Sequence, residues 1–427
     1  MKPIKSYLNL LKLRINMALR REVVSHYPIY GIIEPTLFCS LRCPFCPTGL
    51  QLNLREKKAV DWALWKGIID EIGDYLFHLD MFNWGEPFLH KDTPELIKYA
   101  KSKDINVWVS SNLSVKLTDD YIQRLVRSGL DTLVVSVSGI TQEVYEKYHR
   151  GGNISIVRDN MKRIQLAKSS LKIDNPCVVF KFLAFRHNQH EVETAKAEYR
   201  NWGADAFSSP QAFYRVSDYD QRFCKSVSIP PLEPATLPGC NSLLSTPRVQ
   251  PKYEKRRPCP WLYEAILLNP NGKVSPCCAV WDEKDDFAEY SPTTGFLAAW
   301  NNDNFRRARK FFRRSSKETD LTSATRIQQS PDDSYVVANE SKDLATDKHI
   351  ICTTCPADWD PLIFDLPDEY LQPSIEGHAK QIAGLLLQKK SARALVALML
   401  LSIAAPRTVV GGLFKRGIVS SIQSPSH

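Results

Sequence analysis

The chain has 427 residues, of which 43% are hydrophobic and 24% charged, values that are ordinary for a soluble globular protein and allow two domains. Its eleven cysteines are too few for a small disulfide scaffold and no secretory signal is visible, so we expect a cytoplasmic protein whose grouped cysteines bind metal. The net charge of +9 lies in the ends, since residues 1–21 and 376–427 each carry +6, and a body without a basic patch argues against a nucleic-acid partner.

Residues 1–27 predict a basic amphipathic helix at the amino terminus. Apolar residues recur through Tyr7–Leu19, with lysines and arginines around them. Basic charge interleaved with apolar residues favours peripheral contact with a membrane surface.

Residues 28–210 predict an α/β core in which strands alternate with helices. The expected strands are Tyr30–Ile33, Leu76–Phe82, Asn106–Ser110, Thr132–Val137, Val178–Phe185 and Ala204–Phe207. The expected helices are Val60–Ile72, Thr93–Lys101, Asp119–Ser128, Ile154–Ala167 and Glu191–Trp202. Six such repeats with short connections imply a parallel sheet, and the chemistry of such folds lies at the carboxyl ends of the strands.

The rest of the chain divides into three parts. Residues 211–258 are rich in Pro and Ser and are interpreted as a bridging segment. Residues 259–370 contain the later cysteines and are expected to form a second domain, interrupted by a polar, disordered insertion at 314–348. Residues 371–427 are expected to form a basic apolar helical tail, and the apolar run Ala394–Ala405 is too short to cross a bilayer. That run is a buried helix, an interfacial helix or a re-entrant segment.

The strongest motif is a three-cysteine loop directly after the first predicted strand. Cys39, Cys43 and Cys46 have the spacing C-x3-C-x2-C. Thiolates bind iron–sulfur clusters, usually four to a cubane, so three ligands leave one iron open for a reactant. A zinc loop or a coincidence is the alternative, but Pro47-Thr48-Gly49 offers no fourth zinc ligand.

The stretch Glu34-Pro-Thr-Leu-Phe-Cys-Ser-Leu-Arg-Cys-Pro-Phe-Cys-Pro resembles the signature loop of the radical S-adenosylmethionine (SAM) superfamily. The resemblance implies a partial (β/α)6 TIM-like barrel and a [4Fe-4S] cluster whose open iron is chelated by SAM. In this family one electron, supplied by a reductant such as a flavodoxin or ferredoxin, cleaves SAM to methionine and a 5′-deoxyadenosyl radical that removes a substrate hydrogen. Phe45 would then pack beside the adenine.

Three later segments resemble the same family in the expected order. Asn83-Trp-Gly-Glu86-Pro resembles the GGEP motif, so Glu86 would accept from the SAM amino group. Asn112 follows the third strand, and Ser136 and Arg150 are the candidates for the ribose and carboxylate contacts. The alternatives are that Glu86 caps a helix, Asn112 shapes a turn and Arg150 is a surface cation.

The second cysteine group resembles the SPASM and twitch extensions of that family. It comprises Cys259, Cys277, Cys352 and Cys355, and these four would hold one auxiliary [4Fe-4S] cluster of the shorter twitch type. Gly272 lies in a hairpin-turn signal that would bring Cys259 and Cys277 together. A zinc site is the alternative. Cys278 is a competitor of Cys277, although adjacent strand residues face opposite ways.

The sequence predicts an enzyme that oxidises or rearranges its substrate, with no acid or base residue identified. The apolar, basic ends suggest work near a membrane, and the 38 residues before Cys39 are too few for a winged-helix peptide-docking domain. Both observations favour a small-molecule or carbohydrate precursor as substrate. The alternatives are a peptide- or protein-modifying maturase and, in a different class, a non-catalytic iron–sulfur or zinc scaffold.

Overall fold

A computed structural model of the chain describes residues 2–209, 258–313, 327–329 and 335–337. Most of the predicted bridging segment, Cys352, Cys355 and the carboxyl-terminal tail lie outside these residues. Within the predicted insertion, the structure describes an antiparallel pair of short strands, β10 (Ile327–Gln329) and β11 (Tyr335–Val337).

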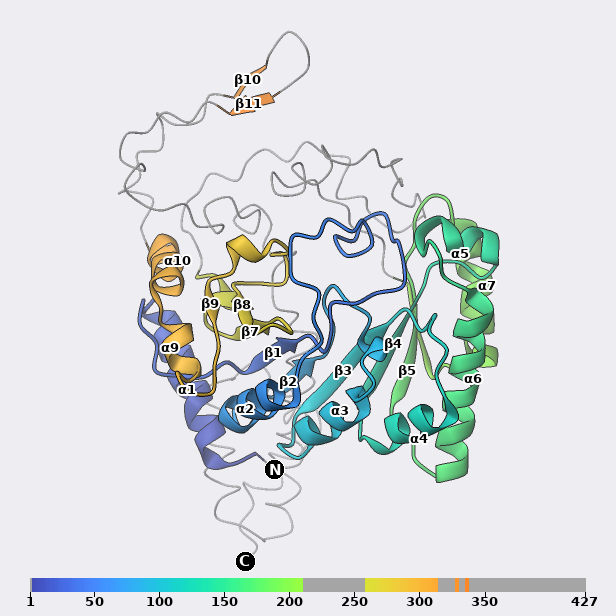
Figure 1. Ribbon diagram of the computed structural model, residues 1–427, viewed down its shortest axis with the longest axis horizontal. Coiled ribbons are helices and arrows are strands. Elements are labelled where there is room, and N and C mark those ends of the chain that lie inside the picture. Colours follow the sequence, from blue (N-terminus) through green and yellow to red (C-terminus); the bar gives the residue numbers. More distant parts are fainter. Residues whose placement is uncertain (1, 210–257, 314–326, 330–334, 338–427) are drawn as a thin grey trace, which may run out of the picture.

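A nine-stranded sheet in the order β6-β5-β4-β3-β2-β1-β7-β8-β9 forms the centre of the molecule (Figure 1). Its strands are β1 (Tyr30–Ile33), β2 (His78–Asp80), β3 (Asn106–Ser111), β4 (Thr132–Val137), β5 (Cys177–Phe182), β6 (Ala206–Ser208), β7 (Ala265–Leu268), β8 (Lys273–Ser275) and β9 (Ala288–Glu289). The strands from β6 to β7 are parallel, and the last two are antiparallel. Among the described strands the sheet does not close, which confirms the partial barrel.

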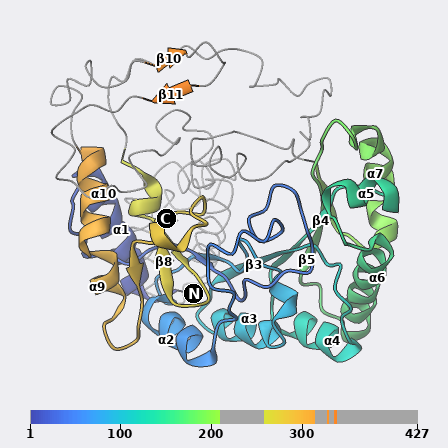
Figure 2. The same ribbon diagram turned by 45° about the horizontal axis from the view of Figure 1, so that its top comes forward.

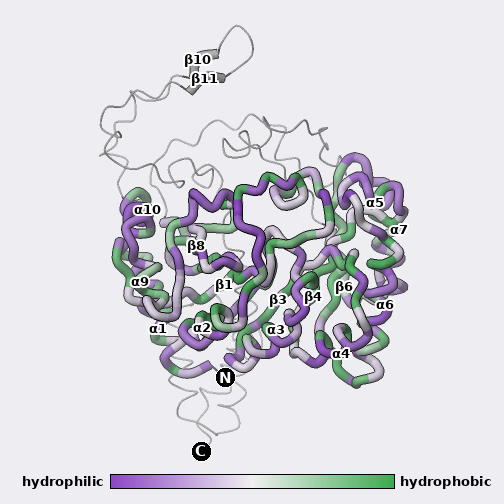
Figure 3. The backbone as a smooth tube through the Cα atoms, viewed as in Figure 1, coloured by the Kyte–Doolittle hydropathy of each residue, from purple (hydrophilic) through white to green (hydrophobic). Residues whose placement is uncertain are grey.

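Helices cover the outer face of the curved sheet (Figures 1 and 2). They are α2 (Trp62–Ile72), α3 (Thr93–Lys101), α4 (Asp119–Arg127), α5 (Gln142–Tyr148), α6 (Ile154–Leu171) and α7 (Val192–Glu198). Both hydrophobic and hydrophilic stretches occur along each of them, as expected for helices with one apolar face (Figure 3). The core lies between these helices and the sheet, where Leu133 and Val135 of β4 and Val157 and Ile164 of α6 are fully buried.

Local sequence explains where α4 begins and ends. Thr118 caps it, since the hydroxyl accepts from the Tyr121 amide at 3.1 Å. Acidic residues occupy its first turn and Arg124 and Arg127 its last, which matches the helix dipole. Helix α5 was not among the predicted elements, because seven residues are too few for a clear helical period.

The amino-terminal helix α1 (Ile4–Ala18) packs along the body of the protein rather than standing apart from it. Tyr7, Leu10 and Leu13 are completely buried. Lys2 is also buried and donates to the carbonyl oxygens of Gly73 and Lys103, at 2.9 and 2.6 Å. One face of the predicted surface helix is therefore part of the core, and only the opposite face remains for a membrane.

The predicted hairpin is present in the second half of the sheet. Strands β7 and β8 pair antiparallel, and Gly272 in their turn has a φ of +87°, which favours glycine. Cys259 precedes β7 and Cys277 follows β8, so the two cysteines lie at the same end of the hairpin. Because β7 pairs parallel with β1, the cysteine-bearing hairpin extends the barrel sheet itself. Helices α9 (Phe296–Trp300) and α10 (Asp303–Arg313) follow it.

Candidate functional site

The three-cysteine loop leaves β1 at its carboxyl end, where active sites of parallel sheets lie. Its backbone is held from two sides. The Arg42 amide donates to the Arg150 carbonyl oxygen at 2.8 Å, and the Glu86 amide donates to the Phe38 carbonyl oxygen at 2.8 Å. These bonds connect the loop to the segments that follow β2 and β4. The predicted site therefore gathers at one edge of the sheet.

The thiols of this loop share one electrostatic environment. Cys39, Cys43 and Cys46 are free and half-buried. Burial raises the pKa of Cys39 to about 12, and the nearby charges of Glu86 and Cys46 act in the same direction. Burial also raises the pKa of Cys43, with a further contribution from its two companion thiols. Among the described residues, no three His, Cys, Asp or Glu side chains are placed to hold a single metal ion.

Glu86 is buried at the centre of the site, with both carboxylate oxygens occupied. One oxygen accepts from the Ser111 hydroxyl at 2.7 Å and from the Phe88 amide at 3.1 Å. The other accepts from the Asn112 amide at 2.8 Å and keeps a lone pair for another donor. Burial raises the pKa of Glu86, which these three donors oppose. The alternative interpretation of Glu86 as a helix cap also applies, because its side chain caps the 3-10 turn η1 (Pro87–Leu89).

A second buried carboxylate, Glu34 at the end of β1, holds the loop that contains Glu86. One Glu34 oxygen accepts from the Trp84 amide at 2.5 Å and also from the Gly85 amide. The other oxygen is buried without a hydrogen-bond partner among the described residues. A Cβ on Gly85 would lie 1.8 Å from the Thr36 carbonyl oxygen, so only glycine fits this approach.

Asn112 and Ser136 lie at the ends of β3 and β4. The side-chain nitrogen Nδ2 of Asn112 is 3.8 Å from Cys39 Sγ, and the side-chain oxygen accepts from the Ser114 backbone amide at 2.8 Å. Asn112 therefore does shape a turn, as the alternative interpretation predicted, and it also contacts the cysteine loop. Ser136 is half-buried near the end of β4.

Phe45 and Arg150 lie on the side of the loop nearer α5. The Phe45 ring stacks on Phe185 with a centroid distance of 6.4 Å and tilts against Tyr148 at 6.5 Å. Arg150 is exposed, and its positive charge opposes the rise in the pKa of Cys43. Both residues thus lie close to the cysteine loop.

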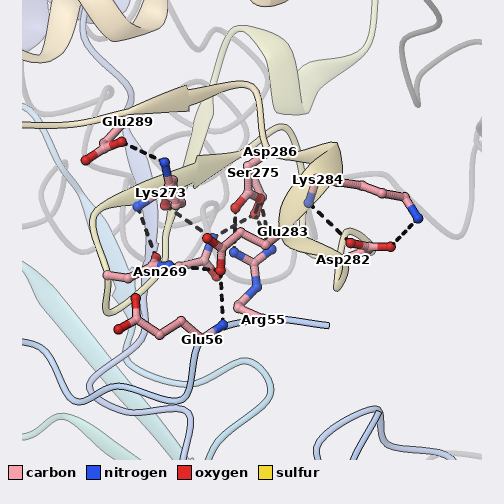
Figure 4. Close-up of polar contacts among 11 residues, drawn as sticks. Arg55, Glu56, Asn269, Lys273, Ser275, Asp282, Glu283, Lys284, Asp286 and Glu289 are labelled. Carbon is pink, nitrogen blue, oxygen red and sulfur yellow. Dashed lines mark hydrogen bonds and ion pairs between the residues drawn. The ribbon is translucent and has the colours of Figure 1, made fainter. Parts of the chain in front are cut away.

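The segment after Cys46 also contacts the connection between β8 and β9, which contains Cys277 (Figure 4). Arg55 donates to both oxygens of Asp286, at 2.5 and 2.9 Å, and these side chains are only 5% and 3% exposed. Asp286 accepts in addition from the Ser275 hydroxyl at 2.5 Å, and Ser275 accepts from Asn269 at 2.8 Å. A buried polar network therefore fixes the loop after Cys46 to the loop after Cys277.

An open cavity of about 820 Å³ lies beside this network. Its lining combines both loops and comprises Asn53, Leu54, Arg55, Glu56, Lys273, Asp282, Glu283, Lys284, Asp286, Phe287, Ala288 and Glu289. Most of the charges pair with one another, as Figure 4 shows for Lys273 with Glu289 and for Lys284 with Asp282.

The donor set suits an iron–sulfur cluster with SAM. Three thiols lie within eight residues of one loop, and the buried carboxylate of Glu86 lies on a segment that is hydrogen-bonded to this loop. One Glu34 oxygen has no hydrogen-bond partner among the described residues, and Glu34 is close enough to Cys46 to raise its pKa. A hydrogen-bond acceptor is therefore available beside the three thiols. Cys277 and Cys278 are both half-buried, whereas the other two predicted auxiliary ligands lie outside the described residues.

Sequence reasoning missed the roles of Glu34 and Ser111. Ser111 reaches Glu86 from β3, and Glu34 holds the peptide before Glu86 from β1. An acidic residue that directly follows the apolar strand Tyr30–Ile33 is an unusual feature, and it could have drawn attention to Glu34.

Two family models match the chain in the expected order. The model for the radical SAM superfamily matches residues 33–195, and the model for an iron–sulfur cluster-binding domain, SPASM, matches residues 259–324. Together they cover both cysteine loops that the structure describes.

Individual proteins also match the chain. The PqqA peptide cyclase of Xanthomonas campestris pv. campestris is 24% identical over 267 residues, which cover 59% of this chain and 68% of the relative. The PqqA peptide cyclase of Gluconobacter oxydans is 26% identical over 263 residues, covering 59% and 70%. The crystal structure of SuiB from Streptococcus suis bound to S-adenosylmethionine matches with a TM-score of 0.49 at 16% identity, over 69% of this chain and 70% of that one. The two domain matches, in this order, place the chain in the radical SAM superfamily, as an enzyme with a SPASM-type cluster-binding domain that uses a [4Fe-4S] cluster, SAM and auxiliary iron–sulfur ligation.

Proposed function

We propose that this radical SAM enzyme modifies a peptide. The observation that carries the proposal is the match to PqqA peptide cyclases, which covers 59% of this chain. The name of these relatives states that they act on a peptide. An alignment over about two thirds of their length supports a shared substrate class more than a shared cluster alone would.

This proposal replaces the preference for a small-molecule or carbohydrate precursor. That preference rested on charged ends and on the short segment before Cys39, and neither observation describes a substrate pocket. The comparisons favour the peptide-modifying alternative. Net oxidation of the substrate is one possible outcome of hydrogen removal, and the proposal does not depend on it.

Cys39, Cys43 and Cys46 would hold the catalytic cluster. Glu86 would accept a hydrogen bond from the SAM ammonium with its remaining lone pair, while Asn112 orients the cysteine loop. The cluster and SAM, when bound, supply the radical that removes a hydrogen from the substrate.

Phe45, Ser136 and Arg150 would complete the SAM site. Phe45 would pack beside the adenine from the aromatic cluster that it forms with Tyr148 and Phe185. Ser136 would donate to the ribose and Arg150 would pair with the carboxylate of SAM. Cys259 and Cys277, with Cys352 and Cys355, would hold the auxiliary cluster.

Peripheral contact with a membrane is also proposed, for the outer face of α1. Leu8, Ile15 and Leu19 are 44%, 46% and 57% exposed there. Lys12 and Arg21 are exposed near them and would suit an anionic surface. No helix in the described part of the chain has the length and apolarity needed to cross a bilayer.

The experiment uses anaerobically reconstituted protein with SAM and a one-electron reductant. A mixture of short synthetic peptides and a mixture of mono- and oligosaccharides are added separately, and the release of 5′-deoxyadenosine is measured. We expect the peptides to raise release above the substrate-free level and a covalent mass change to appear among them.

The triple variant Cys39→Ala, Cys43→Ala, Cys46→Ala is the control and should release no 5′-deoxyadenosine with either mixture. Stimulation by the saccharides alone would overturn the peptide assignment while leaving the radical SAM chemistry intact.

A further inference from the structure

The strands of the barrel present two faces, and the inner one carries a charged residue. Leu133, Val135, Phe180 and Phe182 of β4 and β5 are buried in the core under the outer helices. Because side chains alternate along a strand, the residues between them point to the concave side of the sheet. Lys181 lies between the two phenylalanines, so its side chain leaves β5 toward the inside of the barrel.

Lys181 lies next to a predicted SAM contact. Its register partner on β4 is Ser136, and its partner on β6 is Ser208. Neighbouring strands are about 4.8 Å apart, so Lys181 enters the barrel at the level where the ribose of SAM is expected. A group held by Lys181 would therefore lie close to the place where hydrogen is removed.

The ammonium of Lys181 forms no ion pair among the described residues, although the carboxylate of Asp80 is near enough to influence it. The side chain is half-buried, and burial lowers the pKa of Lys181 whereas the charge of Asp80 raises it. Asp80 is already engaged, because its two oxygens pair with the Tyr30 hydroxyl at 2.5 Å and with His78 at 2.9 Å. Within the described residues, Lys181 has neither a hydrogen bond nor an ion pair.

Other lysines that are withdrawn from solvent have partners. Lys168 pairs with Asp205 at 2.7 Å, and Lys101 pairs with Asp131 at 2.6 Å. A partly desolvated charge is costly unless an anion or several hydrogen bonds compensate it. Lys181 is the exception in this comparison, and its position inside the barrel makes it accessible to a substrate.

We propose that Lys181 binds a carboxylate in the barrel and that this carboxylate belongs to the peptide substrate. The inference rests on the proposed function and deepens it, because it assigns an Asp or Glu side chain, or the carboxyl terminus, to the peptide position near the reacting carbon. An ammonium in a partly dry site distinguishes a carboxylate from its neutral amide by a charge-assisted hydrogen bond. SAM contains the only other carboxylate expected at this level, and the test separates the two sources.

The test selects binders from a random display library of short peptides on full-length, reconstituted, SAM-loaded protein. Wild type should retain Asp and Glu over Asn and Gln by about tenfold, the effect of one charge-assisted hydrogen bond. Lys181→Met should lose this preference, Lys181→Arg should keep it, and Lys181→Glu should favour Lys and Arg instead. Lys162→Met, which alters an exposed lysine of α6, is the matched control and should behave as wild type. Iron content verifies that each variant is folded.

SAM affinity, measured without peptide, is the second arm. It should be the same in Lys181→Met and in wild type, and a tenfold loss would assign the cation to the carboxylate of SAM and overturn the inference. Selected peptides without an acidic preference, or a preference that survives Lys181→Met, would overturn it as well. If SAM-loaded wild type selected no peptide at all, the proposed function itself would fail and the inference with it.

Discussion

The Glu86 carboxylate caps η1 and is also proposed to accept from the SAM ammonium, and a substitution tests the second role. In Glu86→Gln the amide oxygen can still accept from Ser111 and Phe88, whereas the NH2 group no longer accepts from the Asn112 amide. The negative charge that would face the SAM ammonium is also gone. We expect SAM binding to weaken by tens-fold, because a charge-assisted hydrogen bond contributes on the order of 2–3 kcal/mol. Equilibrium binding of SAM measures this, and iron content should not change. Unaltered affinity would mean that the Glu86 loop is only a structural turn.

His26 makes stability depend on pH. Its ring is fully buried, with Nε2 2.8 Å from the Tyr263 carbonyl oxygen and Nδ1 2.9 Å from the Asn16 amide nitrogen, and burial lowers the pKa of His26 to about 4. Between pH 6.5 and 4 the unfolded chain binds a proton that the folded chain refuses, so stability falls as pH falls, by about 3 kcal/mol in the limit. Urea unfolding of the apoprotein at pH 7.5 and 5 should show a smaller loss for His26→Gln. Equal losses in both proteins would contradict this origin.

At the scale of elements, the pair Arg55–Asp286 joins the two cysteine-bearing loops. Removing one partner leaves a buried charge, so Asp286→Asn should destabilise the protein by about 3–5 kcal/mol, whereas Arg55→Met with Asp286→Leu should recover much of that loss. Glu289→Gln on β9 breaks the exposed ion pair with Lys273 and should lower the free energy of unfolding by less than about 1 kcal/mol. Denaturant midpoints of the four proteins test this, and equal effects of Asp286→Asn and Glu289→Gln would exclude a special role for the buried pair.

At the scale of the whole molecule, the cluster count separates the two halves of the chain. Reconstituted protein should bind about eight irons, and the triple variant of Cys39, Cys43 and Cys46 to Ala should keep about four. Iron and zinc analysis provides the measurement. Complete loss of iron in the triple variant, or zinc in place of iron, would disprove two independent clusters.

Membrane contact would involve the exposed face of α1. Since Tyr7, Leu10 and Leu13 are buried, deleting α1 would expose the core, and surface substitutions are the better test. The combined variant Leu8→Gln, Ile15→Gln, Leu19→Gln should lose most of its sedimentation with anionic vesicles, because apolar burial adds to attraction that salt screens over about 10 Å. Leu166→Gln alters a leucine of α6 that is 68% exposed and should sediment as wild type. If the wild-type protein did not sediment with anionic vesicles at low salt, the proposed membrane contact would be wrong.

The sequence by itself determined the alternation of strands and helices and the position of the cysteine loop after the first strand. Both are local properties, because the hydrophobic period and the spacing of the cysteines can be read from short stretches of sequence. All six predicted barrel strands differ from the observed bounds by at most three residues at either end, and β2 is two residues shorter than predicted at each end.

Tertiary structure alone decided which distant residues meet. Glu34 reaches the Glu86 loop across 51 positions, Arg55 reaches Asp286 across 231, and β7 pairs with β1. The unpaired ammonium of Lys181 is likewise visible only when neighbouring strands are placed in register. Burial, hydrogen bonding and charge compensation depend on these long-range contacts, which no pattern within a few residues of sequence specifies.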